Sequence, residues 1–479
     1  MTSFTAIVKL TLRNALRSHI FQLLLGLLLL CALLLPTTVS GSGEGARAYI
    51  QVALKYSLGA VSFILAISTV WIASLVMTQD VESYQLHMVV SKPVSKIKIF
   101  FAKYASVVLL HLVLLLAAGL AIYLGVLWRF HQGSFSKEER GRIESEVLVG
   151  RRVFYPEPPD VKRMAQEAVA QQLEEMRKAG RGQIKSGAAE MEAEILKGIS
   201  EDMLRQRAEV LFRKYGEWTF RDLPRGGTEP IYLRYRLYVG KVDTEAQRHT
   251  IGLWAGSLET RKETAESADG AAAPAAEEEY VRNWVPLTRE PEELYAGRFH
   301  EKKMRPAIID RDSTVTLRYI NLDAQKDKVY FQAVDGPLLM MKVTGFTGNF
   351  VRALLVILLL EVIYAGISCA AAAALSMPTA IFTVLSYMFL GSVAPLILTT
   401  RQLADPAKHL GYWIGKAAMQ VVVPLQEFEI SQKIADGELV EWVYLGGLTL
   451  NYFILRALPL ILLGCWLYWR RELGLVVRK

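Results

Sequence analysis

Signatures of catalysis are missing from this chain of 479 residues. It contains no G-x-x-x-x-G-K-[ST] loop, so it cannot bind ATP through a P-loop of its own. The motifs H-E-x-x-H, C-x-x-C and G-x-S-x-G are absent as well, and the seven histidines are scattered along the chain. We therefore expect a non-catalytic chain that itself binds no metal and no cofactor.

Cysteine is also scarce. The three cysteines, Cys31, Cys369 and Cys465, all lie inside long apolar runs. A cysteine in such a run is usually a small apolar packing residue. We therefore expect neither disulfide bonds nor redox chemistry.

Apolar sequence is abundant instead, and it is concentrated at both ends of the chain, around a polar middle. Hydrophobic residues make up 52% of the chain, and its formal net charge is +8. The prominent basic residues flank the apolar runs, where they orient membrane helices. Membrane lipid is therefore an expected partner, and nucleic acid is not.

Six apolar runs are predicted to cross a bilayer, which takes about 20 residues per helix. They are Ile20–Leu35, Ser57–Val76, Tyr104–Trp128, Gly345–Leu375, Thr379–Thr400 and Leu450–Trp469. The sequence therefore predicts a polytopic α-helical membrane protein with six transmembrane helices.

The N-terminal stretch Met1–His19 predicts an amphipathic helix on the inner leaflet. Lys9, Arg13 and Arg17 lie among apolar residues there, and no acidic residue is present. A cleaved signal peptide is disfavoured, because no clear small-residue cleavage site precedes Pro36. With an even number of spans, both termini are expected in the cytoplasm.

A polar loop, Met77–Lys103, separates the second and third spans. It carries four lysines against Asp80 and Glu82, and a basic excess in a short loop indicates the cytoplasmic side. Lys92-Pro93 breaks any helix within it. From charge and pattern alone, the loop is either an interfacial turn that only fixes topology or a short helix that a cytoplasmic partner grips.

The order of residues in this loop resembles the integral-membrane subunits of ABC-2 type transporters. The resemblance lies in an acidic pair after a span, then apolar residues, then Ser91–Lys96, then Phe100 and Lys103 opening the next span. In that family the loop contains the coupling helix that docks on the ATPase. The coupling residues that the resemblance implies are Asp80, Glu82, Tyr84, Ser91, Lys92, Pro93 and Lys96.

The resemblance also implies a wider assembly. Two permease subunits, identical or related, would pair with two ATPase subunits, and ATP with Mg²⁺ would be bound by those ATPases. The expected location is the cytoplasmic (inner) membrane of a bacterium.

Residues 129–344 form a polar insertion that, by alternation of the spans, is expected outside the cytoplasmic membrane. Residues 157–215 are rich in helix-forming residues, and Gly180, Gly182 and Gly187 favour a helical hairpin over one rod. Residues 217–343 contain separated alternating stretches, which predict a small β-sandwich. An α+β extracytoplasmic domain is therefore expected, and an envelope partner could contact it.

Aromatic residues of this sandwich suggest a binding role. Its pattern looks like that of jelly-roll modules that bind sugars, in which Trp254 and Trp284, with Tyr232 and Tyr330, would stack on a ligand. The same side chains can simply form the core of the sandwich. Core packing is the favoured interpretation.

Three polar residues inside the spans are candidates for a translocation path or the bundle interior: Glu361, His111 and Arg456. A carboxylate that faces lipid costs roughly 2.5–3.5 kcal/mol, so Glu361 is expected to face the interior. It would line a path or a dimer seam there, or hydrogen-bond Tyr364 or Arg456. Because no second ligand is nearby, His111 is predicted to be a hydrogen-bonded packing residue rather than a proton or metal group.

The chain thus divides into three expected parts. Residues 1–128 hold the amphipathic helix, the first three spans and the coupling loop 77–103, and residues 129–344 form the external domain. Residues 345–479 hold the last three spans and an amphipathic external segment, 401–447, which is similar to the re-entrant helices of ABC-2 type subunits.

The expected function is that of a permease subunit in an ATP-driven ABC-2 type transporter, an exporter. Two alternatives stay open. One is an ABC-type complex with a mechanical, envelope-assembly or metalloenzyme-maturation role, and the other is a membrane-anchored receptor for carbohydrate or the envelope. A membrane enzyme is disfavoured, because no polar catalytic cluster is present.

Overall fold

The computed structural model describes residues 3–38, 45–82, 94–133, 135–157, 209–239, 249–261, 280–323, 325–332, 335–399 and 410–470. The chain forms two compact units. The helical unit comprises Met1–Gly150 and Val343–Lys479, and the β unit comprises Arg151–Lys342. Each unit has its own hydrophobic core.

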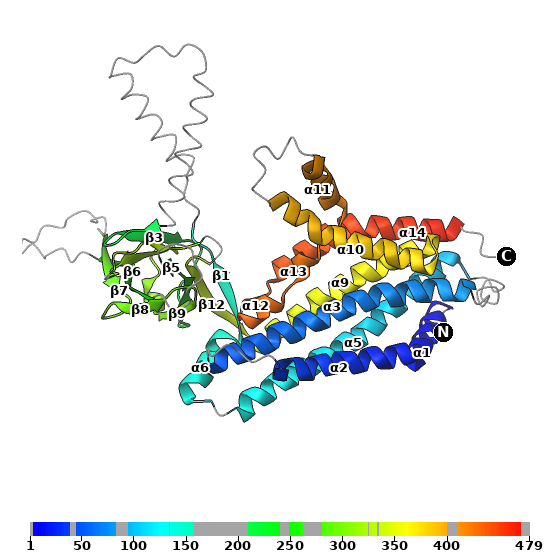
Figure 1. Ribbon diagram of the computed structural model, residues 1–479, viewed down its shortest axis with the longest axis horizontal. Helices are drawn as coiled ribbons and strands as arrows, with labels where there is room; N and C mark the ends of the chain where they lie inside the picture. Colours follow the sequence, from blue (N-terminus) through cyan, green and yellow to red (C-terminus); the bar gives the residue numbers. More distant parts are fainter. Residues whose placement is uncertain are drawn as a thin grey trace, which may run out of the picture. The chain divides into compact units, whose positions relative to one another are not determined.

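Long apolar helices run alongside one another in the helical unit (Figure 1). They and their shorter neighbours are α1 (Ser3–Arg17), α2 (His19–Thr38), α3 (Gly45–Glu82), α5 (Lys96–Gln132), α6 (Lys137–Glu146), α9 (Phe346–Ala374), α10 (Met377–Thr399), α11 (Leu410–Val421), α12 (Ser431–Ala435), α13 (Trp442–Leu448) and α14 (Leu458–Arg470). A π-helical stretch, Thr449–Ala457, joins α13 to α14.

Four stretches are long and apolar enough to cross a membrane: Gly45–Gln79, Lys96–Gln132, Phe346–Ala374 and Trp442–Arg470. The pair α1 and α2, bent by 66°, is a fifth candidate if it is counted as one span. Of the six predicted spans, four or five helices long and apolar enough to cross a membrane are therefore found among the described residues.

A serine explains the bend between α1 and α2. The Ser18 hydroxyl donates to the Ala15 carbonyl (2.7 Å) and accepts from the Phe21 amide (3.2 Å). It thereby closes the end of α1 and caps the start of α2, where a serine oxygen is well suited to an otherwise free amide. The amphipathic α1 can therefore take a direction different from that of the apolar α2.

Small residues let the helices of the bundle approach closely. A methyl group at Gly119 of α5 would lie 2.9 Å from Leu354 Cδ1 of α9. Gly464 of α14 is likewise pressed against Ala370 of α9, so closely that a Cβ there would clash. Glycine and alanine serve this purpose in membrane helices, because association there depends on close packing.

Polar contacts identify the two ends of the bundle. At one end, Lys96 Nζ donates to the Trp469 carbonyl (3.2 Å), which joins the start of α5 to the end of α14. We call this the Lys96 end. At the opposite end of α3, Arg47 pairs with Glu146 of α6 at 2.5 Å. The predicted domain boundary at residue 129 precedes α6, whereas the contacts place residues up to Gly150 in the helical unit.

The β unit contains three sheets among its described residues, whereas a simple sandwich has two (Figure 1). Their orders are β1-β12-β4-β9, β3-β10-β6-β7 with β8 also on β6, and β2-β11-β5. The strands are β1 (Val149–Phe154), β2 (Glu209–Val210), β3 (Tyr215–Phe220), β4 (Ile231–Arg236), β5 (Tyr238–Val239), β6 (His249–Arg261), β7 (Tyr280–Pro286), β8 (Glu292–Tyr295), β9 (Phe299–Met304), β10 (Val315–Asn321), β11 (Val329–Tyr330) and β12 (Leu338–Gly345).

Aromatic rings fill the core of the β unit. Trp254 packs against Tyr235 at 4.9 Å and Tyr319 at 5.3 Å between ring centroids, and Phe331 contacts both Trp254 and Tyr319. Burial raises the pKa of the Tyr235 and Tyr319 hydroxyls above their ordinary values, so both stay neutral. Such ring clusters contribute large buried areas to a small domain.

The predicted helical segment 157–215 differs from the structure where the structure describes it. Residues 209–215 form β2, a turn and the start of β3, because Val210 is buried and pairs with Val329 of β11. Tertiary pairing outweighs the local helical pattern at this point. Residues 158–208 lie outside the described residues.

Candidate functional site

Glu361 lies in the middle of α9 and is 1% exposed. Neither of its carboxylate oxygens has a hydrogen-bond partner among the described residues. The two expected partners bind elsewhere: the Tyr364 hydroxyl donates to the Val423 carbonyl (3.0 Å), and Arg456 Nη1 donates to the Val422 carbonyl (2.7 Å). The predicted hydrogen bond from Glu361 to Tyr364 or Arg456 is therefore wrong.

Tyr364 and Arg456 bind backbone carbonyls because the α-helical backbone is broken between α11 and α12. We call residues 422–430 the interrupted segment; it holds only a short 3-10 turn, Leu425–Phe428. Carbonyls at a helix end lack intrahelical partners, and a buried carbonyl left without a hydrogen bond destabilises the fold. These carbonyls therefore accept hydrogen bonds from side-chain donors that lie close to them.

Tyrosine and arginine side chains satisfy this backbone. The Tyr387 hydroxyl donates to the Val421 carbonyl (3.0 Å) and accepts from the Val423 amide (3.1 Å). Arg456 also donates to the Met419 carbonyl (2.5 Å). Arg456 belongs to the π-helical stretch before α14, and π-helical turns are frequent at functional sites.

Asn349, one turn into α9, holds the loop between α12 and α13. Its Nδ2 donates to the Glu438 carbonyl (2.7 Å), and its Oδ1 accepts from the Val440 amide (2.8 Å). The sequence analysis did not single out Asn349, Tyr364 or Tyr387 for these roles. The available signal was a polar group that falls on the interior face of an apolar helix.

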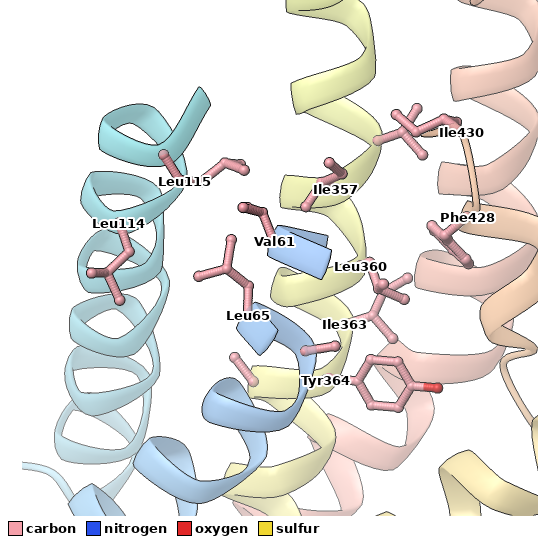
Figure 2. Packing of buried hydrophobic residues seen from close by; sticks show 14 of the residues in the cluster. Val61, Leu65, Leu114, Leu115, Ile357, Leu360, Ile363, Tyr364, Phe428 and Ile430 are labelled. Carbon is pink, nitrogen blue, oxygen red and sulfur yellow. The ribbon is translucent and has the colours of Figure 1, made fainter. Parts of the chain in front are cut away.

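A pocket of about 370 Å³ adjoins the interrupted segment. Its walls are one face of α3 between Leu58 and Ala66, Ile357 and Leu360 of α9, and the residues from Leu425 to Ser431 other than Glu427. Figure 2 shows the two α9 residues beside α3, with the interrupted segment on their other side. The pocket therefore lies within the helical unit.

Glu361 is close in the sequence to the two α9 residues that line the pocket. It follows Leu360 and stands one turn beyond Ile357, and residues spaced by three and four share a helix face. Leu360 and Ile357 line the pocket, while Tyr364 contacts the interrupted segment. Glu361 itself is not among the described residues that line the pocket, but it lies one helical turn from the lining residue Ile357.

His111 of α5 is fully buried, and both ring nitrogens have a partner. Nε2 lies 3.2 Å from the Ser68 hydroxyl, and Nδ1 lies 3.0 Å from the Val107 carbonyl. These are the bonds that a packing histidine requires. Among the described residues, no group of three or more His, Cys, Asp and Glu could hold a metal ion.

The proposed coupling residues lie at the end of α3, at the start of α5 and in the stretch between them. Lys96 lies at the start of α5, where it binds the Trp469 carbonyl. The backbone of Asp80 and Glu82 belongs to the end of α3. Outside the described residues lie Tyr84, Ser91, Lys92 and Pro93.

The two tryptophans proposed for external ligand binding have different surroundings. Trp254 is 1% exposed inside the aromatic core, so it cannot stack on an external ligand, and the core interpretation applies to it. Trp284 of β7 is half-buried, and the Arg318 guanidinium lies 3.6 Å from its ring centroid. Arg318 also pairs with Glu217 at 2.7 Å. One face of Trp284 is therefore already covered.

Comparison with known proteins gives no relative to guide the assignment. No protein-family model, curated protein or solved structure matches the chain. The residues around Glu361 and the pocket are therefore the basis for a functional proposal.

Proposed function

We propose that this chain is the membrane-spanning permease subunit of an ATP-driven transporter of the ABC-2 type, an exporter whose ATP is hydrolysed on a separate chain. The observation that carries the proposal is Glu361, a carboxylate that is buried in the middle of α9 without a described partner. Ionisable residues in membrane helices are costly and typically mark substrate or ion pathways. Interrupted backbone at membrane depth is likewise confined to protein interiors and to cavities.

The charge pattern supports a cytoplasmic Lys96 end. Basic residues lie in α1, at the start of α5 and at the end of α14, and the Lys96 bond to Trp469 brings the last two together. Positive charge collects on the cytoplasmic side of membrane proteins. If α2 and α10 each count as a span, the total is six, both termini are cytoplasmic, and the β unit lies outside a bacterial inner membrane.

Coupling to ATP is proposed to pass through Met77–Lys103. The lysine excess and the Ser91–Lys96 motif there resemble the ABC-2 coupling loop. ATP-driven closure of the ATPases would pull on this loop and tilt α3 and α5. Such a shift requires that ATP favours one of two conformations, and the ATPase partner supplies that difference in binding free energy.

The experiment is a pull-down of the detergent-solubilised full chain from its native host, followed by mass spectrometry and an ATPase assay. The expected result is recovery of a P-loop ATPase with the wild-type chain. Deletion of Ser91–Lys96, or the double change Asp80→Lys and Glu82→Lys, should abolish that recovery and leave the chain folded.

The matched control is the double change Glu138→Lys and Glu144→Lys on α6, which reverses two exposed acidic residues at the end of the bundle opposite Lys96. It should leave ATPase recovery intact. Normal ATPase association in the loop variants would contradict the coupling role. Recovery of envelope glycans with no ATPase would favour the receptor alternative.

A second arm tests Glu361 itself. Glu361→Gln should leave ATPase recovery intact, because the change lies in the bundle interior, and it should lower ATP hydrolysis coupled to the membrane subunit. Wild-type coupled activity in this variant would remove Glu361 from the proposed path.

A further inference from the structure

We infer that the pocket between α3, α9 and the interrupted segment binds an amphiphile with an apolar chain and a cationic ammonium head, which enters from the membrane. This inference goes beyond the proposed transport function. Binding is a property of this chain alone, so it can be measured without an ATPase.

The size and lining of the pocket suit an apolar chain. Its volume of about 370 Å³ falls within the roughly 300–1,000 Å³ of small-molecule sites. Leu58, Ala66, Ile357, Leu360 and Phe428 are among the apolar residues of its wall. An apolar ligand chain buried there leaves water or lipid and contacts an apolar protein surface. The polar groups of the pocket lining then set the orientation of the ligand.

The pocket reaches the outer surface of the bundle. Phe63, one of its lining residues, is 64% exposed. It belongs to a stripe of large exposed apolar side chains on α3 that also includes Tyr56, Ile67 and Trp71. On a helix that can cross a membrane, an exposed apolar stripe faces lipid. The ligand can therefore enter sideways from the bilayer.

The lining of the pocket also includes hydrogen-bond acceptors. Gln426 uses its amide nitrogen to donate to the Ser392 carbonyl (2.8 Å), so its amide oxygen stays available to accept. The Glu429 carboxylate accepts from the Ser431 hydroxyl at 3.5 Å and forms no ion pair with any described residue. A carboxylate with an amide oxygen nearby complements a group that donates several hydrogen bonds and carries positive charge.

The charge of the head group is inferred from the lack of cationic side chains among the described residues of the pocket wall. Among the described residues, no lysine or arginine lines the pocket. Nearby, Lys433 lies over the Tyr444 ring at 4.2 Å, and Arg456 binds backbone carbonyls. A phosphate, sulfate or carboxylate head would therefore meet Glu429 without a compensating cation. An ammonium head has a partner of opposite charge.

The experiment uses the purified full chain in phosphatidylcholine nanodiscs. A dodecylamine that carries a photoreactive diazirine on its chain is cross-linked, and the labelled peptides are mapped by mass spectrometry. Labelling is expected to be saturable, to fall on α3 between Leu58 and Ala66, and to be displaced by plain dodecylamine. Dodecanoate should displace it at least about tenfold more weakly, because its head repels Glu429.

Two variants test separately how the head group and the apolar chain of the ligand contribute to binding. Glu429→Gln should raise the half-saturating concentration of the amine about tenfold, whereas the control Glu427→Gln, an exposed acidic residue outside the pocket lining, should not change it. Ser62→Phe should block labelling of α3, because the ring fills the pocket. Equal affinities in the two glutamate variants, equal displacement by dodecanoate, or labelling that never saturates would overturn the inference.

Discussion

In the β unit the buried guanidinium of Arg151 pairs with the carboxylate of Glu301, whereas in the bundle the guanidinium of Arg456 contacts backbone carbonyls. The side chains of the β-unit pair are 0% and 3% exposed, and Arg151 also lies over the Tyr232 ring at 5.4 Å. In the bundle, the buried Glu361 has no described partner.

The difference lies in what each backbone leaves unsatisfied. Sheet ladders use the carbonyls of neighbouring strands, so a buried cation in the β unit needs a carboxylate. The helix break before the interrupted segment leaves carbonyls without intrahelical partners, and these accept hydrogen bonds from Arg456 and from the hydroxyls of Tyr364 and Tyr387. A carboxylate in the same region is then left without a donor, which is unusual for a purely structural group.

The largest loss of folding stability is expected from Arg151→Met in the β unit. Removing the cation leaves Glu301 buried without its ion partner, which typically costs about 3–5 kcal/mol. Pulse proteolysis of the full chain across a urea series, with β-unit fragments read by mass spectrometry, measures this loss. The double change Arg151→Met and Glu301→Met should recover most of it, and a double variant as unstable as Arg151→Met would refute the pairing.

A smaller loss is expected from Arg456→Met in the bundle. The change removes charged donors from the Met419 and Val422 carbonyls, and a hydrogen bond to a charged group contributes about 1.5–3 kcal/mol. Thermal unfolding of the full chain in detergent measures the loss. Arg470→Met, at an exposed arginine at the end of α14, is the control and should change stability little.

The bundle should differ from the β unit in whether a second substitution can restore the lost stability. Since the partners of Arg456 are backbone carbonyls, no second side-chain substitution restores the loss. In particular, Glu361→Gln in the Arg456→Met background should not, because the two side chains are not paired. Rescue by that double variant would mean that Arg456 and Glu361 interact after all.

The smallest expected change in stability is the pH-dependent one in the β unit. Burial lowers the pKa of His300, and its hydrogen bond to the Tyr295 carbonyl (2.8 Å) opposes this in part. Below its ordinary value of about 6.5, the unfolded chain then binds a proton that the folded β unit resists. Stability should therefore fall as the pH drops through this range.

The measurement compares wild type with His300→Gln at about pH 7.5 and about pH 5.5, on either side of the ordinary histidine pKa. Urea-dependent proteolysis gives the stability of the β unit at each pH. The glutamine variant should lose less stability on acidification, since it cannot take up the proton. Identical losses in both proteins would exclude His300 as a source of the pH dependence.

Much of the helical unit could be predicted from composition. Hydropathy located α3, α5 and α9, because a membrane helix needs a long apolar run whatever surrounds it. The cost of a carboxylate in lipid placed Glu361 in the interior, and its low exposure agrees with that expectation. The amphipathic pattern before Ser18 likewise predicted a separate helix, α1.

The partners of these residues could not be predicted in the same way. The donors that seemed available to Glu361 bind carbonyls that lie some sixty residues further along the chain, and those carbonyls are free only because α11 ends at Val421. The strand pairing of Val210 with Val329 is a similar case, since it overrides a helical pattern through a contact between distant residues. Local periodicity carries no information about either contact.

By itself, the sequence determined that this protein has membrane-embedded helices, that a polar chain separates two apolar regions, and that a carboxylate is buried among the helices. The hydrophobic effect and the cost of burying charge act on each residue according to its own chemistry, so these features can be read locally. Only the tertiary structure decided which donors reach the interrupted segment, that Glu361 is left without a described partner, and that a pocket forms between α3, α9 and the interrupted segment. Those outcomes depend on which distant groups meet, and competition among them is settled by geometry in the folded chain.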